Sequence, residues 1–92
     1  MPHEQKDDDE KKLVKITING IGDEQPKGEY TFDQIVAITK RLIPDIATGP
    51  NILYTITYRG ADGHKPEGRL VEGGTVKIKD MSIFNVTPSD KS

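Results

Sequence analysis

Residues 31–59, TFDQIVAITKRLIPDIATGPNILYTITYR, place a single amphipathic helix before a long strand, and this order decides the fold. Thr31 and Gln34 have the spacing of a capping box, in which each side chain binds a backbone amide that the start of a helix leaves unpaired. Pro44 ends the helix near Leu42, because proline disfavours the helical conformation of the residue before it. The apolar residues on one face of this helix are Phe32, Ile35, Val36 and Leu42.

The segment that follows the helix is the clearest strand in the chain. Apolar and polar side chains alternate over residues 52–59, which is the pattern of a strand with one buried face. Its length and its apolar face suit a central position in a sheet. One face carries Ile52, Tyr54, Ile56 and Tyr58, and the other carries Leu53, Thr55, Thr57 and Arg59.

Toward the N-terminus, a second alternating segment begins at Leu13 and ends in the turn signal Asn19–Gly20. We expect a short strand near Lys27–Tyr30 to pair with it as a hairpin. Residues 1–12 carry many charges and nothing to bury, so we expect a disordered charged arm, with the acidic run 7–10 exposed to solvent.

Toward the C-terminus, glycine-rich turns separate three further extended segments. Short strands are predicted at Arg69–Glu72 and Thr75–Lys79, and a last strand at Met81–Thr87. Pro88 has no amide hydrogen, so we expect ladder pairing to stop there. Residues 88–92 are then a flexible tail.

These elements predict an α+β fold in which one helix packs across one face of a mixed sheet of four to five strands, the β-grasp arrangement. The handedness of crossover connections predicts that the strand at residues 52–59 is parallel to the first strand or near it. The folded domain spans residues 13–87. We expect its core to contain Val14, Ile16, Ile18, Phe32, Ile35, Val36, Leu42, Tyr54, Ile56, Leu70, Val76, Ile78, Phe84 and Val86.

Composition narrows the classes of function. The chain has 92 residues, 30% of them charged, a net charge of −2 and no cysteine. This balance argues against a nucleic-acid partner, and no apolar run approaches the ~20 residues of a membrane helix. His64 and the remote His3 cannot supply a metal site, which needs three or four ligands. We therefore expect a cytoplasmic monomer with no catalytic residues, no metal and no cofactor.

The sheet face turned away from the helix is the candidate partner-binding face. It is expected to combine Lys15, Thr17 and Asn85 with Leu53, Thr55, Thr57, Arg59 and Ile83. Leu53, Arg59 and Ile83 are the candidate anchors, because Leu53 and Ile83 are the apolar points on a face that is mostly threonine, and arginine is enriched among the residues that dominate binding energy. An ordinary solvated β surface is the alternative, since threonine suits exposed strands.

Two stretches carry a family resemblance. GPNILYTITYRGADGHKPEGRLVEGGTVKIKDMSIFNVTPSDKS, residues 49–92, and the helix motif YTFDQIVAIT resemble the bacterial multiubiquitin family of ubiquitin-like domains. The resemblance implies a non-enzymatic protein modifier. It also implies three partners, encoded nearby in operons that include anti-phage systems: an adenylating activating enzyme that uses ATP, a conjugating enzyme and a deconjugating protease.

The chain departs from the ubiquitin pattern at its end. It holds one copy of the domain and closes on TPSDKS, without a terminal glycine pair. The conjugation tail implied here is Pro88, Ser89, Asp90, Lys91 and Ser92, with Ser92 or a trimmed residue supplying the carboxylate. The alternatives are a non-covalent ubiquitin-like interaction domain, a sulfur carrier, or an inert terminus.

Overall fold

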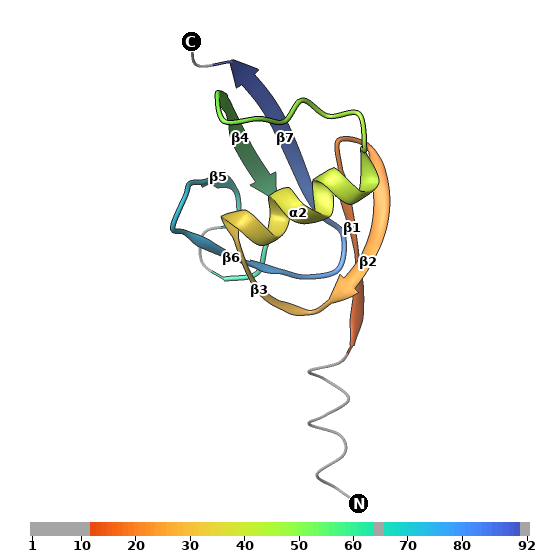
Figure 1. The fold of residues 1–92 in the computed structure, drawn as a ribbon. Helices are drawn as coiled ribbons and strands as arrows, with labels where there is room; N and C mark the ends of the chain where they lie inside the picture. Colours follow the sequence, from red (N-terminus) through yellow and green to blue (C-terminus); the bar gives the residue numbers. More distant parts are fainter. Residues whose placement is uncertain (1–11, 64–65, 91–92) are drawn as a thin grey trace, which may run out of the picture.

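The computed structural model describes residues 12–63 and 66–90, and one helix lies across one face of a five-stranded mixed sheet (Figure 1). The sheet order is β2-β1-β7-β4-β5, and a second sheet pairs β3 with β6. The predicted α+β, ubiquitin-like β-grasp fold is confirmed. The elements are β1 Leu13–Ile18, β2 Ile21–Pro26, β3 Gly28–Thr31, α2 Phe32–Leu42, β4 Ile52–Arg59, β5 Gly68–Leu70, β6 Thr75–Ile78 and β7 Ser82–Asp90.

The central strand of the sheet is β7. It pairs with β1 in parallel and with β4 antiparallel, so β4 runs antiparallel to β1 and does not touch it. The prediction that the strand after the helix is parallel to the first was therefore wrong. The parallel neighbour of β1 is β7, so the crossover rule applies to the connection from β1 to β7 and not to β4.

The partner of β1 in the first hairpin is β2, at Ile21–Pro26, and not the predicted segment Lys27–Tyr30. Asn19 and Gly20 have φ values of 52° and 84°, which suit the two-residue turn that follows the twist of a hairpin. That turn returns the chain immediately, so the second strand must begin at Ile21. The segment Gly28–Thr31 forms β3 and pairs with β6 instead.

The helix has the predicted ends. The Gln34 amide donates to Thr31 Oγ1 at 3.1 Å, and the Thr31 amide donates to Gln34 Oε1 at 2.8 Å, which completes the capping box. The last helical residue is Leu42, before Pro44. The face that α2 buries is broader than predicted, because Ile38 and Thr39 are also buried on it.

The core differs from the predicted set at four positions. Ile38 and Ala61 are buried, whereas Leu42 and Tyr54 are only partly buried against the cluster. Leu42 is the terminal residue of α2, and the Tyr54 hydroxyl donates to the carbonyl of Ala47 at 2.6 Å in an exposed contact. The other twelve predicted residues are buried.

Pairing of the last strand does not stop at Pro88, which contradicts the predicted end near Thr87 and the predicted free tail. Pro88 lies opposite Tyr54, and β7 continues to Asp90 opposite Ile52. The Val86 amide donates to Asn19 Oδ1, on the side of β7 away from β4. Amide directions alternate along a strand, so the Pro88 nitrogen faces the same side and its missing hydrogen removes no bond to β4.

The predicted charged arm, residues 1–12, lies outside the described residues except for Lys12. The carbonyl of Lys12 accepts a hydrogen bond from the Lys27 amide at 2.7 Å, so this residue joins the fold. Within the described part of the chain, no helix is long and apolar enough to cross a membrane.

Candidate functional site

The structure brings together the five residues of the predicted partner-binding face. The four β4 residues are exposed, and they lie opposite β7 in the pairs Leu53–Ser89, Thr55–Thr87, Thr57–Asn85 and Arg59–Ile83. Ile83 is half-buried at the centre of the sheet. Because paired residues point to the same side, all five share the face away from α2.

One row of this face crosses four strands. Arg59 of β4 lies opposite Ile83 of β7, Ile83 lies opposite Thr17 of β1, and Thr17 lies opposite Gly22 of β2. Gly22 has no side chain, so the row ends in open space. This row of side chains therefore begins with the positive charge of Arg59, continues with the apolar Ile83, and ends in a depression at Gly22, on the edge of the sheet.

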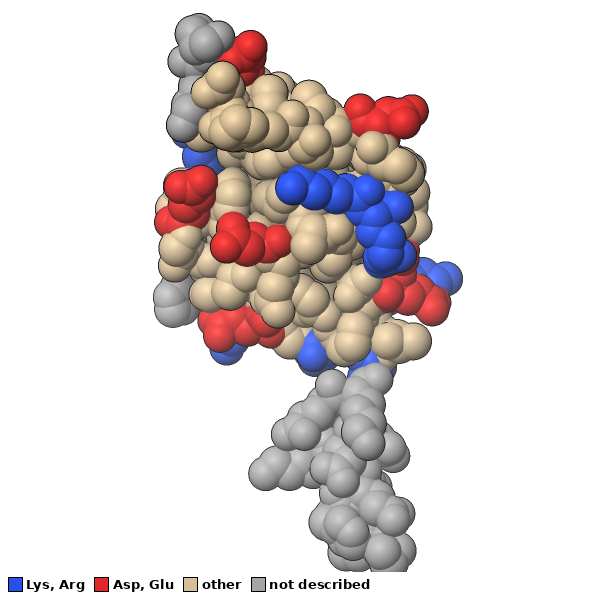
Figure 2. All heavy atoms as spheres, in the orientation of Figure 1, with Lys and Arg blue, Asp and Glu red and all other residues tan. Residues whose placement is uncertain are grey.

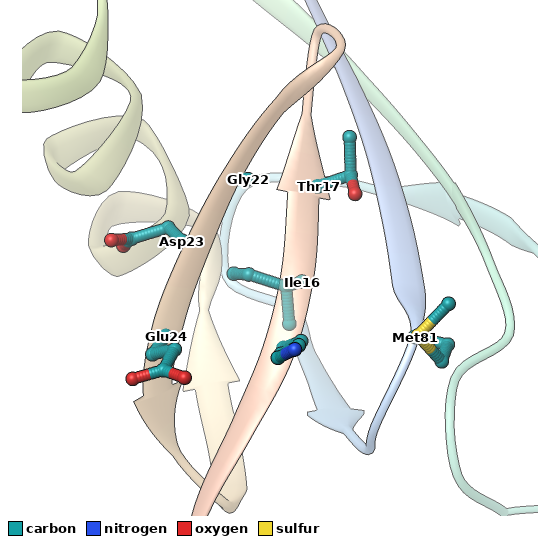
Figure 3. Close-up of a pocket in the computed structure, with 7 residues that line it drawn as sticks. Ile16, Thr17, Gly22, Asp23, Glu24 and Met81 are labelled. Atoms are coloured by element: carbon teal, nitrogen blue, oxygen red, sulfur yellow. The ribbon is translucent and has the colours of Figure 1, made fainter.

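The depression at Gly22 is an open hollow of about 530 Å³ (Figure 3). The Met81 side chain is 68% exposed and stands at its far side, near the start of β7. Asp23 points away from the hollow, toward α2. The lining residues are Lys15, Ile16, Thr17, Gly22, Asp23, Glu24 and Met81.

Sequence reasoning missed Met81 and Gly22 as parts of this face. The Asn19–Gly20 turn held a usable signal for Gly22, since a two-residue hairpin turn fixes the register that sets Gly22 opposite Thr17. Met81 precedes β7 with φ of 73°, and the sequence has no pattern that indicates this conformation. Its exposure is visible only in the folded chain.

A second hollow, of about 520 Å³, opens beside the first row. Arg59 and Arg69 both line it, together with Thr57 and Asn85. Within the described residues, neither arginine forms an ion pair, and Thr57 lies opposite both Arg69 and Asn85. Glu67 also lines the hollow, so its charged side chains are two guanidinium groups and one carboxylate. The two guanidinium groups can donate hydrogen bonds to a carboxylate of a partner.

The opposite face of the molecule, which carries α2, mixes charges of both signs (Figure 2). Arg41 pairs there with Asp23, with 2.7 Å between Nη2 and Oδ2. Partial burial alone would raise the pKa of Asp23, but hydrogen bonds from Gln25 and Arg41 outweigh it and hold the pKa below its usual value. The arginine on this face is therefore engaged, in contrast to Arg59 and Arg69.

The predicted conjugation tail is divided by the structure. Pro88, Ser89 and Asp90 belong to β7, with Pro88 half-buried and the other two exposed. Lys91 and Ser92 lie outside the described residues, as does His64. Among the residues that are described, no group of three histidine, cysteine or acidic side chains could hold a metal ion.

Comparison with known proteins agrees with this architecture. The family model of Multiubiquitin matches residues 14–90, which include all of the five-stranded sheet except Leu13, the first residue of β1. No curated protein and no solved structure shows a significant match. The match covers most of the chain, and the chain belongs to the Multiubiquitin family of ubiquitin-like domains.

Proposed function

We propose that this chain is a ubiquitin-like protein modifier in a bacterial ubiquitination-like pathway of the kind linked to anti-phage defence. Its C-terminal carboxylate is activated by a partner adenylating enzyme with ATP and passed to a conjugating enzyme and then to a target. A deconjugating protease removes it. The single observation that carries the proposal is the Multiubiquitin match over residues 14–90 on a β-grasp fold.

In this proposal the outer face is where the enzymes dock. Leu53 is 43% exposed on β4, and Ile83 and Arg59 form a cross-strand pair on the same face. Arginine is enriched among the residues that dominate binding energy at interfaces, and here Arg59 lies beside apolar side chains that a partner can cover. The chain acts as a cytoplasmic monomer with protein partners, and it needs neither nucleic acid nor a membrane.

The non-covalent interaction domain remains a second candidate, and the end of the chain favours it. Thr87 to Asp90 are paired with β4, so this part of the chain cannot enter a narrow active-site channel while the sheet is intact. The same pairing weighs against a sulfur carrier, whose thiocarboxylate also has to reach an active site.

Intact-mass analysis tests the proposal. The chain is incubated with the activating enzyme encoded beside its gene and with ATP, and we expect an ATP-dependent covalent adduct. The control is the same chain with its C-terminus capped as an amide, which leaves the fold unchanged and should abolish the adduct. A deletion of Ser89–Ser92 is a poorer control, because it removes two residues of β7.

The control also separates the candidates. A non-covalent domain would bind its partner equally well with and without the amide, and no adduct would form with either. Adducts that form equally from the amide and the free carboxylate would contradict activation of the C-terminus.

A further inference from the structure

The first part of β7 lies between two strands, β1 and β4, whereas its last part is paired with β4. Ser82, Ile83 and Phe84 pair with β1, and Ile83 and Phe84 also pair with β4. β1 ends at Ile18, while β7 continues beside β4 to Asp90 (Figure 1). The last residues of β7 therefore lie at an edge of the sheet, where the strand paired with them is β4.

A side chain marks the boundary between the two parts. Asn19 Nδ2 donates to the Val86 carbonyl at 2.9 Å, and Asn19 Oδ1 accepts from the Val86 amide at 2.8 Å. The Asn19 amide also donates to the carbonyl of Phe84 at 3.0 Å. Asn19 thus continues the hydrogen bonding of β1 to β7 as far as Val86. We call its two side-chain hydrogen bonds to Val86 the Asn19 clamp.

Burial changes at the same boundary. Phe84 and Val86 are 0% and 2% exposed, and they pair with Tyr58 and the buried Ile56. In the part of β7 beyond Val86, Pro88 is half-buried, and Thr87, Ser89 and Asp90 are exposed. Separation of the strand end from β4 would thus expose little apolar surface.

The surface that Pro88 covers does not depend on Pro88 for its shape. The Tyr54 hydroxyl donates to the Ala47 carbonyl at 2.6 Å, and Lys40 Nζ lies 5.8 Å from the centre of the Tyr54 ring. These contacts come from α2 and from the loop that follows it. Tyr54 therefore keeps its position when Pro88 leaves.

We propose that Pro88–Asp90 is a detachable end of the sheet that must leave β4 before the carboxylate is activated. The inference rests on the proposed function, in which that carboxylate belongs to Ser92, two residues after Asp90. Two residues span only about 7 Å when extended. Release at the Asn19 clamp adds Pro88–Asp90 to the two residues that follow β7, so that about five residues can enter a channel in extended form.

Amide hydrogen exchange tests detachment without any enzyme. The Val86 amide points toward Asn19, and amide directions alternate along a strand. The amides of Asn85, Thr87 and Ser89 therefore all point toward β4, and their exchange rates can be compared directly. We expect Ser89 to exchange at least roughly tenfold faster than Asn85, because a strand end opens locally while the core stays closed. Equal protection of the two amides would overturn the inference.

A disulfide lock tests the requirement for release. Leu53 and Ser89 are directly paired on the outer face, so L53C/S89C joins β7 to β4 beyond the clamp. Paired Cα atoms of this kind lie about 5.5 Å apart, within the range of a disulfide. The control T57C/N85C joins the same two strands before the clamp, and its residues also form a hydrogen-bonded pair. The chain has no cysteine of its own, so no other disulfide can form within the chain.

We expect oxidation to abolish the ATP-dependent adduct of L53C/S89C, and to leave the adduct of T57C/N85C at the rate of its own reduced form. Each comparison is between two redox states of one variant, so the loss of Leu53 or Thr57 from the docking face affects both states equally. Adducts from the locked chain at the rate of its reduced form would overturn the release requirement and leave the modifier function intact. If the unmodified chain forms no adduct, the proposed function fails, and the release requirement fails with it.

Discussion

At the scale of single residues, the turn between β1 and β2 sets the register of the whole outer face. Asn19 and Gly20 take positive φ, and the hairpin they form places Gly22 opposite Thr17 and Glu24 opposite Lys15. Because side chains alternate along a strand, a shift of one residue would turn every β2 side chain to the other face. The hollow beside Met81 exists only in this register.

The two nearby glycines should respond in opposite directions to the same substitution. Gly22 has ordinary extended backbone, and a methyl group there meets no atom within 4 Å, so Gly22→Ala should raise the free energy of unfolding by about 0.5–1 kcal/mol. Gly20 has φ of +84°, so Gly20→Ala should lower it by roughly 1–2 kcal/mol. Urea denaturation of both variants measures the difference. Equal effects would show that the turn does not have the conformation described.

The Asn19 clamp should contribute to stability through its side chain. Asn19→Gly keeps a residue that tolerates φ of 52° but removes two hydrogen bonds to Val86. With about 0.5–1.5 kcal/mol for each bond, the expected loss is roughly 1–3 kcal/mol. The Val86 amide should also exchange faster. A variant as stable as the original chain, with Val86 still protected, would contradict the role assigned to Asn19.

At the scale of elements, the sequence predicted the helix and strands that bury one face, and it failed to predict the edge strand β2 and the end of β7. α2 and β4 follow periodic apolar patterns, and their ends agree with the prediction. β2, with the sequence IGDEQP, buries no residue fully, so it has no alternation to detect. The end of β7 was missed because the effect of Pro88 depends on which side of the strand its nitrogen faces, and only the tertiary pairing shows this.

The faces of β4 can be tested by two neighbouring truncations. Ile56 is 0% exposed in the core, and Ile56→Ala should cost about 2–5 kcal/mol through lost burial and a cavity. Thr55 is exposed on the outer face, so Thr55→Ala should cost less than about 1 kcal/mol. Chemical denaturation gives both values. Similar losses for the two variants would mean that the strand faces are assigned wrongly.

At the scale of the whole molecule, the candidate docking face and the candidate reactive end belong to the same pair of strands. Leu53 lies on the docking face and directly opposite Ser89, at the detachable end of β7. An enzyme that binds Leu53 therefore also contacts the segment that it must release. The sequence predicted which residues share this face, but the connection between face and tail required the register of β4 and β7.

The charged arm should be dispensable for folding up to Lys12. Removal of residues 1–11 should change the melting temperature little, because a segment of this composition has almost no apolar surface to bury. Removal of residues 1–12 also deletes the carbonyl that accepts from the Lys27 amide, at a cost of about 0.5–1.5 kcal/mol. Calorimetry on the two truncations compares them. A large decrease for the shorter deletion would show that the arm packs on the domain.

The charge of the outer face should govern partner binding. Arg59 forms no ion pair among the described residues and lines the same hollow as Arg69, so Arg59→Glu should weaken binding to the activating enzyme at least tenfold, or about 1.4 kcal/mol. Lys77→Glu makes the same change of charge at an exposed position of β6, in the other sheet, and should leave the affinity unchanged. Isothermal titration at two salt concentrations measures both variants. The loss for Arg59→Glu should shrink at high salt, because exposed charges are screened. Equal losses for the two variants would show that net charge, and not this face, guides the encounter.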